Sequence, residues 1–114
     1  MATQPLPAPL LSSGEMSWFA ADDRLRLPAG ATVIREGEPG DTMFVLVRGE
    51  LSVTVQGKPI DYLLPGSVLG EMAMLDARTR SATAVAVTDV ELVRFDQPRF
   101  LDLIRQRPEF AAHI

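Results

Sequence analysis

Short runs of apolar residues, separated by glycine- and proline-containing turns, recur along most of the chain and limit the folds open to it. The runs occupy residues 25–27, 32–35, 43–48, 51–56, 60–64, 81–87 and 90–95. Many short strands at this spacing are typical of a β-sandwich or barrel. No long helical pattern separates the runs, so a parallel βαβ architecture is disfavoured.

In one of these runs, residues 51–55, apolar and polar residues alternate with the period of a half-buried strand. Leu51, Val53 and Val55 are expected to face inward, with Ser52 and Thr54 facing out. The sequence therefore predicts a mainly β fold, an antiparallel β-roll (a jelly roll or double-stranded β-helix) with short flanking α-helices. Six glycines in the turns are expected to serve only positive backbone φ angles and no ligand; these are Gly30, Gly37, Gly40, Gly49, Gly57 and Gly66.

The pattern changes at both ends of the chain. Residues 1–13 carry three prolines and no charged side chain and are expected to form a flexible leader, and residues 14–24 to form a short helix. At the other end, Asp96 is a good N-cap, Pro98 suits a first helical turn, and Pro108 is expected to stop the helix near Arg107. The apolar stripe expected on this helix consists of Phe100, Leu101, Leu103 and Ile104.

Composition excludes several classes of protein. The 114 residues suffice for one domain, assigned to residues 14–114. There is no cysteine and a single histidine, His113, so neither a thiolate nucleophile nor a multi-histidine metal centre, such as a cupin enzyme needs, can be built. We therefore expect no enzyme and no metal. A net charge of −4 argues against a nucleic-acid surface, and no apolar run reaches the roughly 20 residues of a membrane helix.

One stretch, residues 69–83, carries the chemistry of an anion site. Gly70 permits close backbone approach, and the apolar run that begins at Met72 would expose the unpaired N–H groups of a helix start. Arg80 can add a planar two-donor clamp for a phosphate. Glu71 would repel a phosphate but can accept hydrogen bonds from a sugar hydroxyl. From the residues alone, Glu71 and Arg80 can also be read as a structural ion pair.

This stretch resembles the phosphate-binding cassette of the cyclic nucleotide-binding domain family. The family pattern, apolar-Gly-Glu-x-small-apolar, a loop, then Arg-small-Ala-x-apolar, fits residues 69–84, and a second pattern fits residues 33–49. The resemblance implies that Glu71 holds the ribose 2′-hydroxyl and Arg80 the cyclic phosphate. It also implies that backbone amides near Ala73 and at Ser81 complete the phosphate site. Gly70, Met72 and Ala82 belong to the same motif.

The resemblance also implies where the base lies. The family's spacing places Val53, Ile60 and Val68 along the purine, and Ser81 favours cyclic AMP over cyclic GMP. The family's longer C-terminal lid helix is missing or truncated in this chain, which leaves the choice of base open.

The function expected from the sequence is that of a cytoplasmic regulatory module. It would bind cyclic AMP or cyclic GMP as its ligand, without a cofactor, and pass a conformational change to an effector domain, a partner protein or a second copy in a homodimer. Neither nucleic acid nor a membrane is an expected partner. The alternative is a module that keeps the fold for interaction or dimerisation but has given up the nucleotide.

Overall fold

The computed structural model describes Leu11, residues 24–70 and residues 79–109. The elements in these ranges are β1 (Leu25–Leu27), β2 (Thr32–Ile34), β3 (Met43–Arg48), β4 (Leu51–Val55), β5 (Lys58–Leu63), β6 (Val68–Leu69), β7 (Thr83–Ala86), β8 (Val90–Phe95) and α3 (Gln97–Gln106). The strands predicted at residues 25–27, 43–48 and 90–95 are confirmed with the same bounds. The sequence missed β6, and it started β5 two residues too late.

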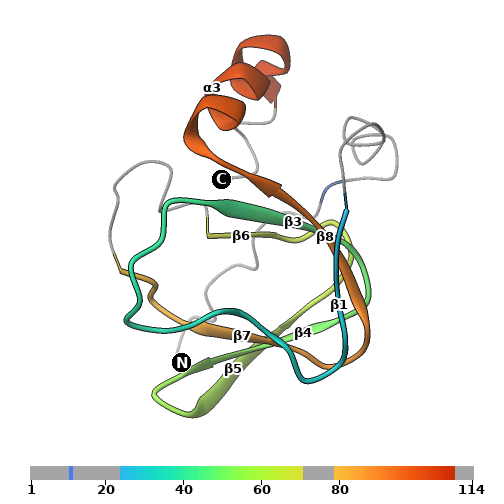
Figure 1. Ribbon diagram of the computed structural model, residues 1–114, viewed down its shortest axis with the longest axis vertical. Coiled ribbons are helices and arrows are strands. Elements are labelled where there is room, and N and C mark those ends of the chain that lie inside the picture. Colours follow the sequence, from blue (N-terminus) through green and yellow to red (C-terminus); the bar gives the residue numbers. More distant parts are fainter. Residues whose placement is uncertain (1–10, 12–23, 71–78, 110–114) are drawn as a thin grey trace, which may run out of the picture.

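The strands form two four-stranded sheets, and the pairings within them are antiparallel. We call the sheet with the order β1-β8-β3-β6 the helix-side sheet, and the sheet with the order β2-β7-β4-β5 the hairpin sheet. Figure 1 shows the two sheets folded against each other, with α3 beyond the end of β8. The fold is therefore the antiparallel β-roll that the sequence predicts.

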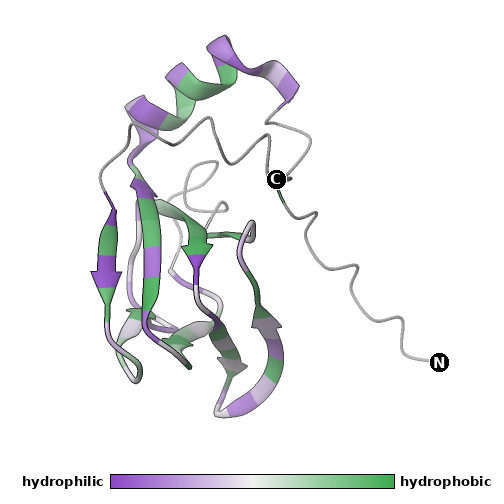
Figure 2. Cartoon of the chain, turned by 90° about the vertical axis from the view of Figure 1, so that its right-hand side faces the viewer, coloured by the Kyte–Doolittle hydropathy of each residue, from purple (hydrophilic) through white to green (hydrophobic). Residues whose placement is uncertain are grey.

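Where α3 covers it, the helix-side sheet is buried on both of its faces. Met43 and Val45 of β3 pack with Phe100 and Leu103 of α3, whereas the alternate residues of β3 point into the space between the sheets. Figure 2 shows hydrophobic and hydrophilic residues alternating along the strands. The cluster between the sheets, which we call the inter-sheet core, contains Phe44, Leu46, Leu51, Leu69, Ala84, Ala86, Val90 and Leu92. The cluster under α3, the helix-side core, contains Leu11, Met43, Val45, Val68, Val93, Phe95, Phe100 and Leu103.

The helix α3 begins and ends where the sequence indicates. Asp96 caps it by accepting a hydrogen bond from the N–H of Arg99 at 3.0 Å, and Arg107 closes it by donating to the carbonyl of Leu103 at 2.7 Å. Phe100 and Leu103 are buried, but Leu101 is 45% exposed, so its predicted place in the apolar stripe is wrong. At about 100° per residue, Leu101 falls well to the side of the face that Phe100 and Leu103 share.

Leu11 belongs to the core, although it lies in the segment predicted to be a flexible leader. Its side chain is 5% exposed, and its N–H donates to the carbonyl of Gly66 at 2.9 Å. The leader prediction therefore does not hold for Leu11. The helix predicted at residues 14–24 lies, up to residue 23, outside the described residues. No helix in the described part of the chain is long and apolar enough to cross a membrane.

Candidate anion-binding site

The backbone of Arg80 is fastened to the loop between β2 and β3. The N–H of Arg80 donates to the carbonyl of Glu38 at 2.8 Å, and the carbonyl of Arg80 accepts from the N–H of Gly37 at 2.9 Å. A β-bridge between Pro39 and Thr79 extends this pairing by one residue. These main-chain contacts fix where the Arg80 side chain leaves the backbone, just before β7.

The Arg80 guanidinium lies between two glycines. A Cβ added to Gly40 would come within 2.6 Å of Arg80 Nη2, and one added to Gly70 within 2.7 Å of Arg80 Nη1. Arg80 Nη2 donates to the hydroxyl of Thr42 at 3.2 Å. The Arg80 guanidinium thus fits into a space that exists because Gly40 and Gly70 lack a Cβ, and the Thr42 hydroxyl orients it. The structure therefore brings together Gly70 and Arg80, as the sequence predicts.

Gly40 has a different role from the one that the sequence indicates. Of the six glycines expected to need positive φ angles, five have them, but Gly40 does not. Its lack of a Cβ leaves room for Arg80 instead. Sequence analysis also missed Asp41 and Thr42 as neighbours of Arg80. The signal that could have identified them was the second family pattern, residues 33–49, which contains Gly40, Asp41 and Thr42.

The charge of Arg80 is incompletely neutralised within the described residues. Burial lowers the pKa of the guanidinium from its ordinary value, and the negative charge of Asp41 opposes that shift. No carboxylate in the described part of the chain forms an ion pair with Arg80. Arg80 Nη1 is buried and has no hydrogen-bond partner there. A buried N–H donor without an acceptor costs free energy of folding. An anion would accept from it through a charge-assisted hydrogen bond.

A cavity of about 320 Å³ opens beside this guanidinium. Its walls come from β2, from the loop that follows it and from the start of β3, and they include Thr32, Ile34, Arg35, Glu38, Thr42, Phe44 and Arg80. The cavity gives an anion access to Arg80, and the one carboxylate among these wall residues, Glu38, is paired with Arg35 at 3.2 Å.

The structure describes only some of the other residues that the sequence predicts for the site. Glu71, Met72 and Ala73 lie outside the described residues, Ser81 is exposed and Ala82 is half-buried. The three residues predicted to line the base do not share one space. Val53 packs on the inter-sheet core, Val68 is in the helix-side core, and Ile60 is 58% exposed on β5, at the edge of the hairpin sheet.

The β-roll and the glycine-flanked arginine define a small β domain with a candidate anion site, and comparison with known proteins gives its family. The family model for the cyclic nucleotide-binding domain matches residues 24–107. The chain belongs to the cyclic nucleotide-binding domain family.

Individual relatives agree with this assignment. The cGMP-dependent protein kinase egl-4 of Caenorhabditis briggsae is 43% identical over 89 residues, covering 78% of this chain and 12% of the kinase. The cAMP-dependent protein kinase regulatory subunit of Aspergillus fumigatus is 37% identical over 99 residues, covering 79% of this chain and 24% of the subunit. The chain therefore spans about a tenth to a quarter of the length of these relatives.

The fold agrees as well. The crystal structure of the Thermus thermophilus catabolite activator protein superposes with a TM-score of 0.75 and 31% identity, over 90% of this chain and 51% of that one. The domain is thus homologous to regulatory domains of cAMP- and cGMP-dependent proteins.

Proposed function

We propose that this chain binds a cyclic nucleotide at Arg80 and uses the bound ligand to regulate an attached or associated effector. The observation that carries the proposal is the Arg80 guanidinium, held between Gly40 and Gly70, with Nη1 lacking a partner among the described residues. A cyclic phosphate supplies the missing negative charge and acceptor oxygens in one group. The cavity beside Arg80 gives that phosphate its access.

The remaining contacts follow from the family assignment and are part of the same proposal. Glu71 accepts from the ribose 2′-hydroxyl, and the backbone amides around Met72, Ala73 and Ser81 donate to the phosphate, with Ala82 closing the motif. Both cyclic AMP and cyclic GMP carry this ribose and phosphate. With serine at position 81, we expect cyclic AMP to bind more tightly.

Transmission is proposed to run through β6. Val68 packs in the helix-side core with Phe100 of α3, Leu69 packs in the inter-sheet core, and Gly70 follows directly at the Arg80 guanidinium. A ligand that moves the segment after Gly70 therefore acts on the packing of α3. The ligand can shift this equilibrium only by the difference between its affinities for the two states. The proposed recipient is an attached or associated effector such as a kinase, a channel or a transcription factor, and the domain itself is proposed to be non-catalytic.

Calorimetric titration of cyclic AMP and cyclic GMP, in parallel, tests the proposal. Arg80→Ala should cost roughly 2–5 kcal/mol of binding free energy, enough to abolish micromolar binding. Arg105→Ala removes an exposed arginine from the last turn of α3 and is the matched control. Thermal unfolding of each variant establishes that it is folded.

Two outcomes would contradict the proposal. Binding to Arg80→Ala as tight as to the wild type would remove Arg80 from the site. Failure of the wild type to bind either nucleotide would leave a fold-retaining interaction or dimerisation module, the alternative that the sequence left open.

A further inference from the structure

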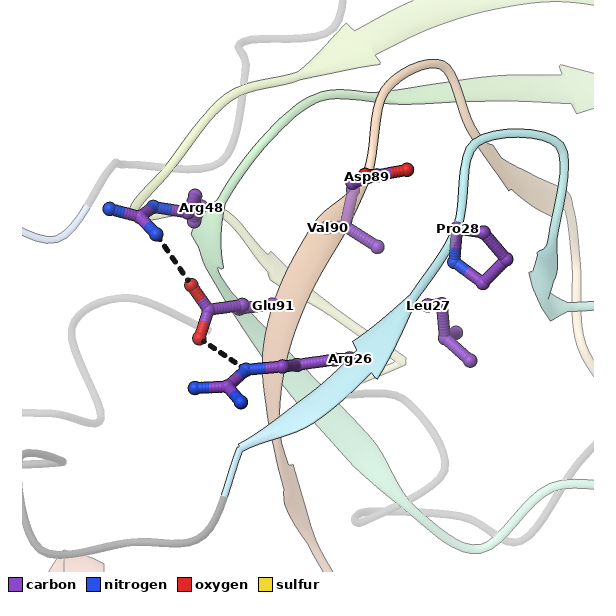
Figure 3. Close-up of a pocket in the computed structure, with 7 residues that line it drawn as sticks. All are labelled: Arg26, Leu27, Pro28, Arg48, Asp89, Val90 and Glu91. Atoms are coloured by element: carbon purple, nitrogen blue, oxygen red, sulfur yellow. Dashed lines mark hydrogen bonds and ion pairs between the residues drawn. The ribbon is translucent and has the colours of Figure 1, made fainter.

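Away from Arg80, a row of three charged side chains crosses the outer face of the helix-side sheet. The strand register places Arg26 of β1 opposite Glu91 of β8, and Glu91 opposite Arg48 of β3. Arg26 Nε lies 3.1 Å from Glu91 Oε1, and Arg48 Nη1 lies 3.2 Å from Glu91 Oε2. Figure 3 shows the carboxylate between the two guanidiniums, one at each oxygen. The row and α3 lie on the same face of the sheet, with α3 covering the other end of that face.

The two arginines are exposed, but the carboxylate between them is not. The side chains of Arg26 and Arg48 are 78% and 77% exposed, against 16% for Glu91. The hydrogen bond from Arg26, reinforced by the charges of Arg26, Arg48 and Arg24, lowers the pKa of Glu91. One carboxylate thus satisfies one nitrogen of each guanidinium, and the outer nitrogens of both forks face solvent.

These side chains line a cavity of about 360 Å³. Leu27, Pro28 and Val90 form its apolar wall, which Figure 3 shows beside the charged row. Asp89 is also on the lining, and its carboxylate accepts a hydrogen bond from the N–H of Ala29 at 3.0 Å. The cavity therefore offers cationic donors next to apolar surface.

The cavity and the Arg80 site lie at opposite ends of β3. Thr42, just before β3, bonds Arg80, whereas Arg48 is the last residue of the strand. At about 3.3 Å per residue, these ends are roughly 20 Å apart. An occupant of the cavity would thus leave the Arg80 site free.

We propose that this cavity docks an aspartate or glutamate side chain from an acidic, partly apolar segment of a partner protein. Charge balance favours a carboxylate. On the lining, Arg26 and Arg48 balance Glu91 and Asp89. Arg24 lies off the lining, but its charge also acts on Glu91 and leaves the group with one positive charge, which a single added carboxylate neutralises. A phosphate dianion would overshoot that balance and face Glu91 at close range. The apolar wall accepts the methylene stem or a neighbouring apolar residue of the segment.

The docking site is measured with a defined probe, a fluorescein-labelled peptide of alternating leucine and glutamate, by fluorescence anisotropy at low ionic strength. We expect saturable binding that weakens with added salt. Arg26→Gln/Arg48→Gln should weaken it by about tenfold, the combined value of two exposed charge pairs. Lys58→Gln/Arg105→Gln removes the same charge from exposed positions elsewhere and should leave the affinity within about twofold.

Glu91→Gln separates docking from a merely structural ion-pair row. If the arginines are a docking site, removing their internal carboxylate frees both forks and strengthens peptide binding. If the row is only structural, Glu91→Gln affects stability and leaves peptide binding unchanged.

The proposal is overturned by equal binding of a leucine–glutamine peptide, by unchanged affinity in Arg26→Gln/Arg48→Gln, or by tighter binding of a leucine–phosphoserine peptide. The Glu91→Gln measurement stands even if the double arginine variant fails to fold. None of these results depends on cyclic nucleotide binding.

Discussion

Gly40→Ala should weaken cyclic nucleotide binding with little effect on stability. The backbone at Gly40 does not have a positive φ, so alanine adds no backbone strain there. Its Cβ would, however, come within 2.6 Å of Arg80 Nη2, whereas carbon and nitrogen in contact need about 3.5 Å. Since the obstacle is the far end of a flexible side chain, the guanidinium moves and the core does not.

The expected loss of affinity follows from that displacement. Relieving the contact with Nη2 needs a shift of about 1 Å, and Nε and Cζ, which lie still closer to the added Cβ, must move farther. This movement stretches the 3.2 Å bond from Arg80 Nη2 to the Thr42 hydroxyl beyond the useful range. It also misaligns the clamp on the phosphate. One hydrogen bond to a charged group contributes about 1.5–3 kcal/mol, so the affinity should fall by roughly ten- to a hundredfold.

Gly57→Ala is the matched control, in the turn between β4 and β5. Gly57 has a φ of +78° and nothing within 4 Å of an added Cβ. Alanine there should cost roughly 1–2 kcal/mol of unfolding free energy through left-handed backbone strain, without touching the guanidinium. Calorimetric titration should therefore show a loss of nucleotide affinity in Gly40→Ala but not in the control. Urea unfolding should show a loss of stability in the control but little in Gly40→Ala. Unchanged nucleotide affinity in Gly40→Ala, with affinity lost in Arg80→Ala, would refute the idea that Gly40 positions the clamp.

Three further predictions concern stability and are measured by urea unfolding. Asp96→Ala removes the cap of α3 and should cost about 1 kcal/mol. Phe100→Ala should cost about 3–5 kcal/mol, whereas Leu101→Ala, at an exposed position, should stay within about 0.5 kcal/mol; equal costs would contradict the packing of α3. Because the arginines lower the folded-state pKa of Glu91, their stabilisation is present above its unfolded pKa, roughly pH 4, and is lost as the pH falls through the lower folded value. Glu91→Gln should therefore lose less stability than the wild type on acidification.

The sequence predicted those parts of the fold that local patterns determine. Strand runs such as residues 43–48 show in the apolar spacing, and the cap at Asp96 shows in the residue type. By contrast, β6 has only two residues, too few for any period to register. Leu11 follows three prolines, and its side chain packs in the helix-side core while its N–H bonds the distant carbonyl of Gly66, contacts that no local pattern contains.

The candidate site divides in the same way. Gly70 and Arg80 share one motif, and they were predicted together and lie together. Gly40 could not be separated from the turn glycines around it, because the reason for its missing Cβ is a side chain that lies far along the sequence. The family's spacing groups Val53 and Val68 along the base. In the structure, Val53 of β4 packs on the inter-sheet core, whereas Val68 of β6 packs in the helix-side core. Spacing along the chain predicts that a residue lies in a strand. Which core its side chain enters depends on the layers that pack on either side of that strand.

The two-sided burial of the helix-side sheet beneath α3 supports the proposed relay of a signal through this small domain. In a sheet with one solvated face, a displaced strand would release its strain into water. Here the consecutive residues Val68 and Leu69 are 5% and 6% exposed in two different cores, with Gly70 next in the chain at the Arg80 guanidinium. Close-packed interiors do not absorb shifts gradually. In the proposed mechanism, a ligand that moves Gly70 must repack Val68 against Phe100, so that α3 is the element that responds.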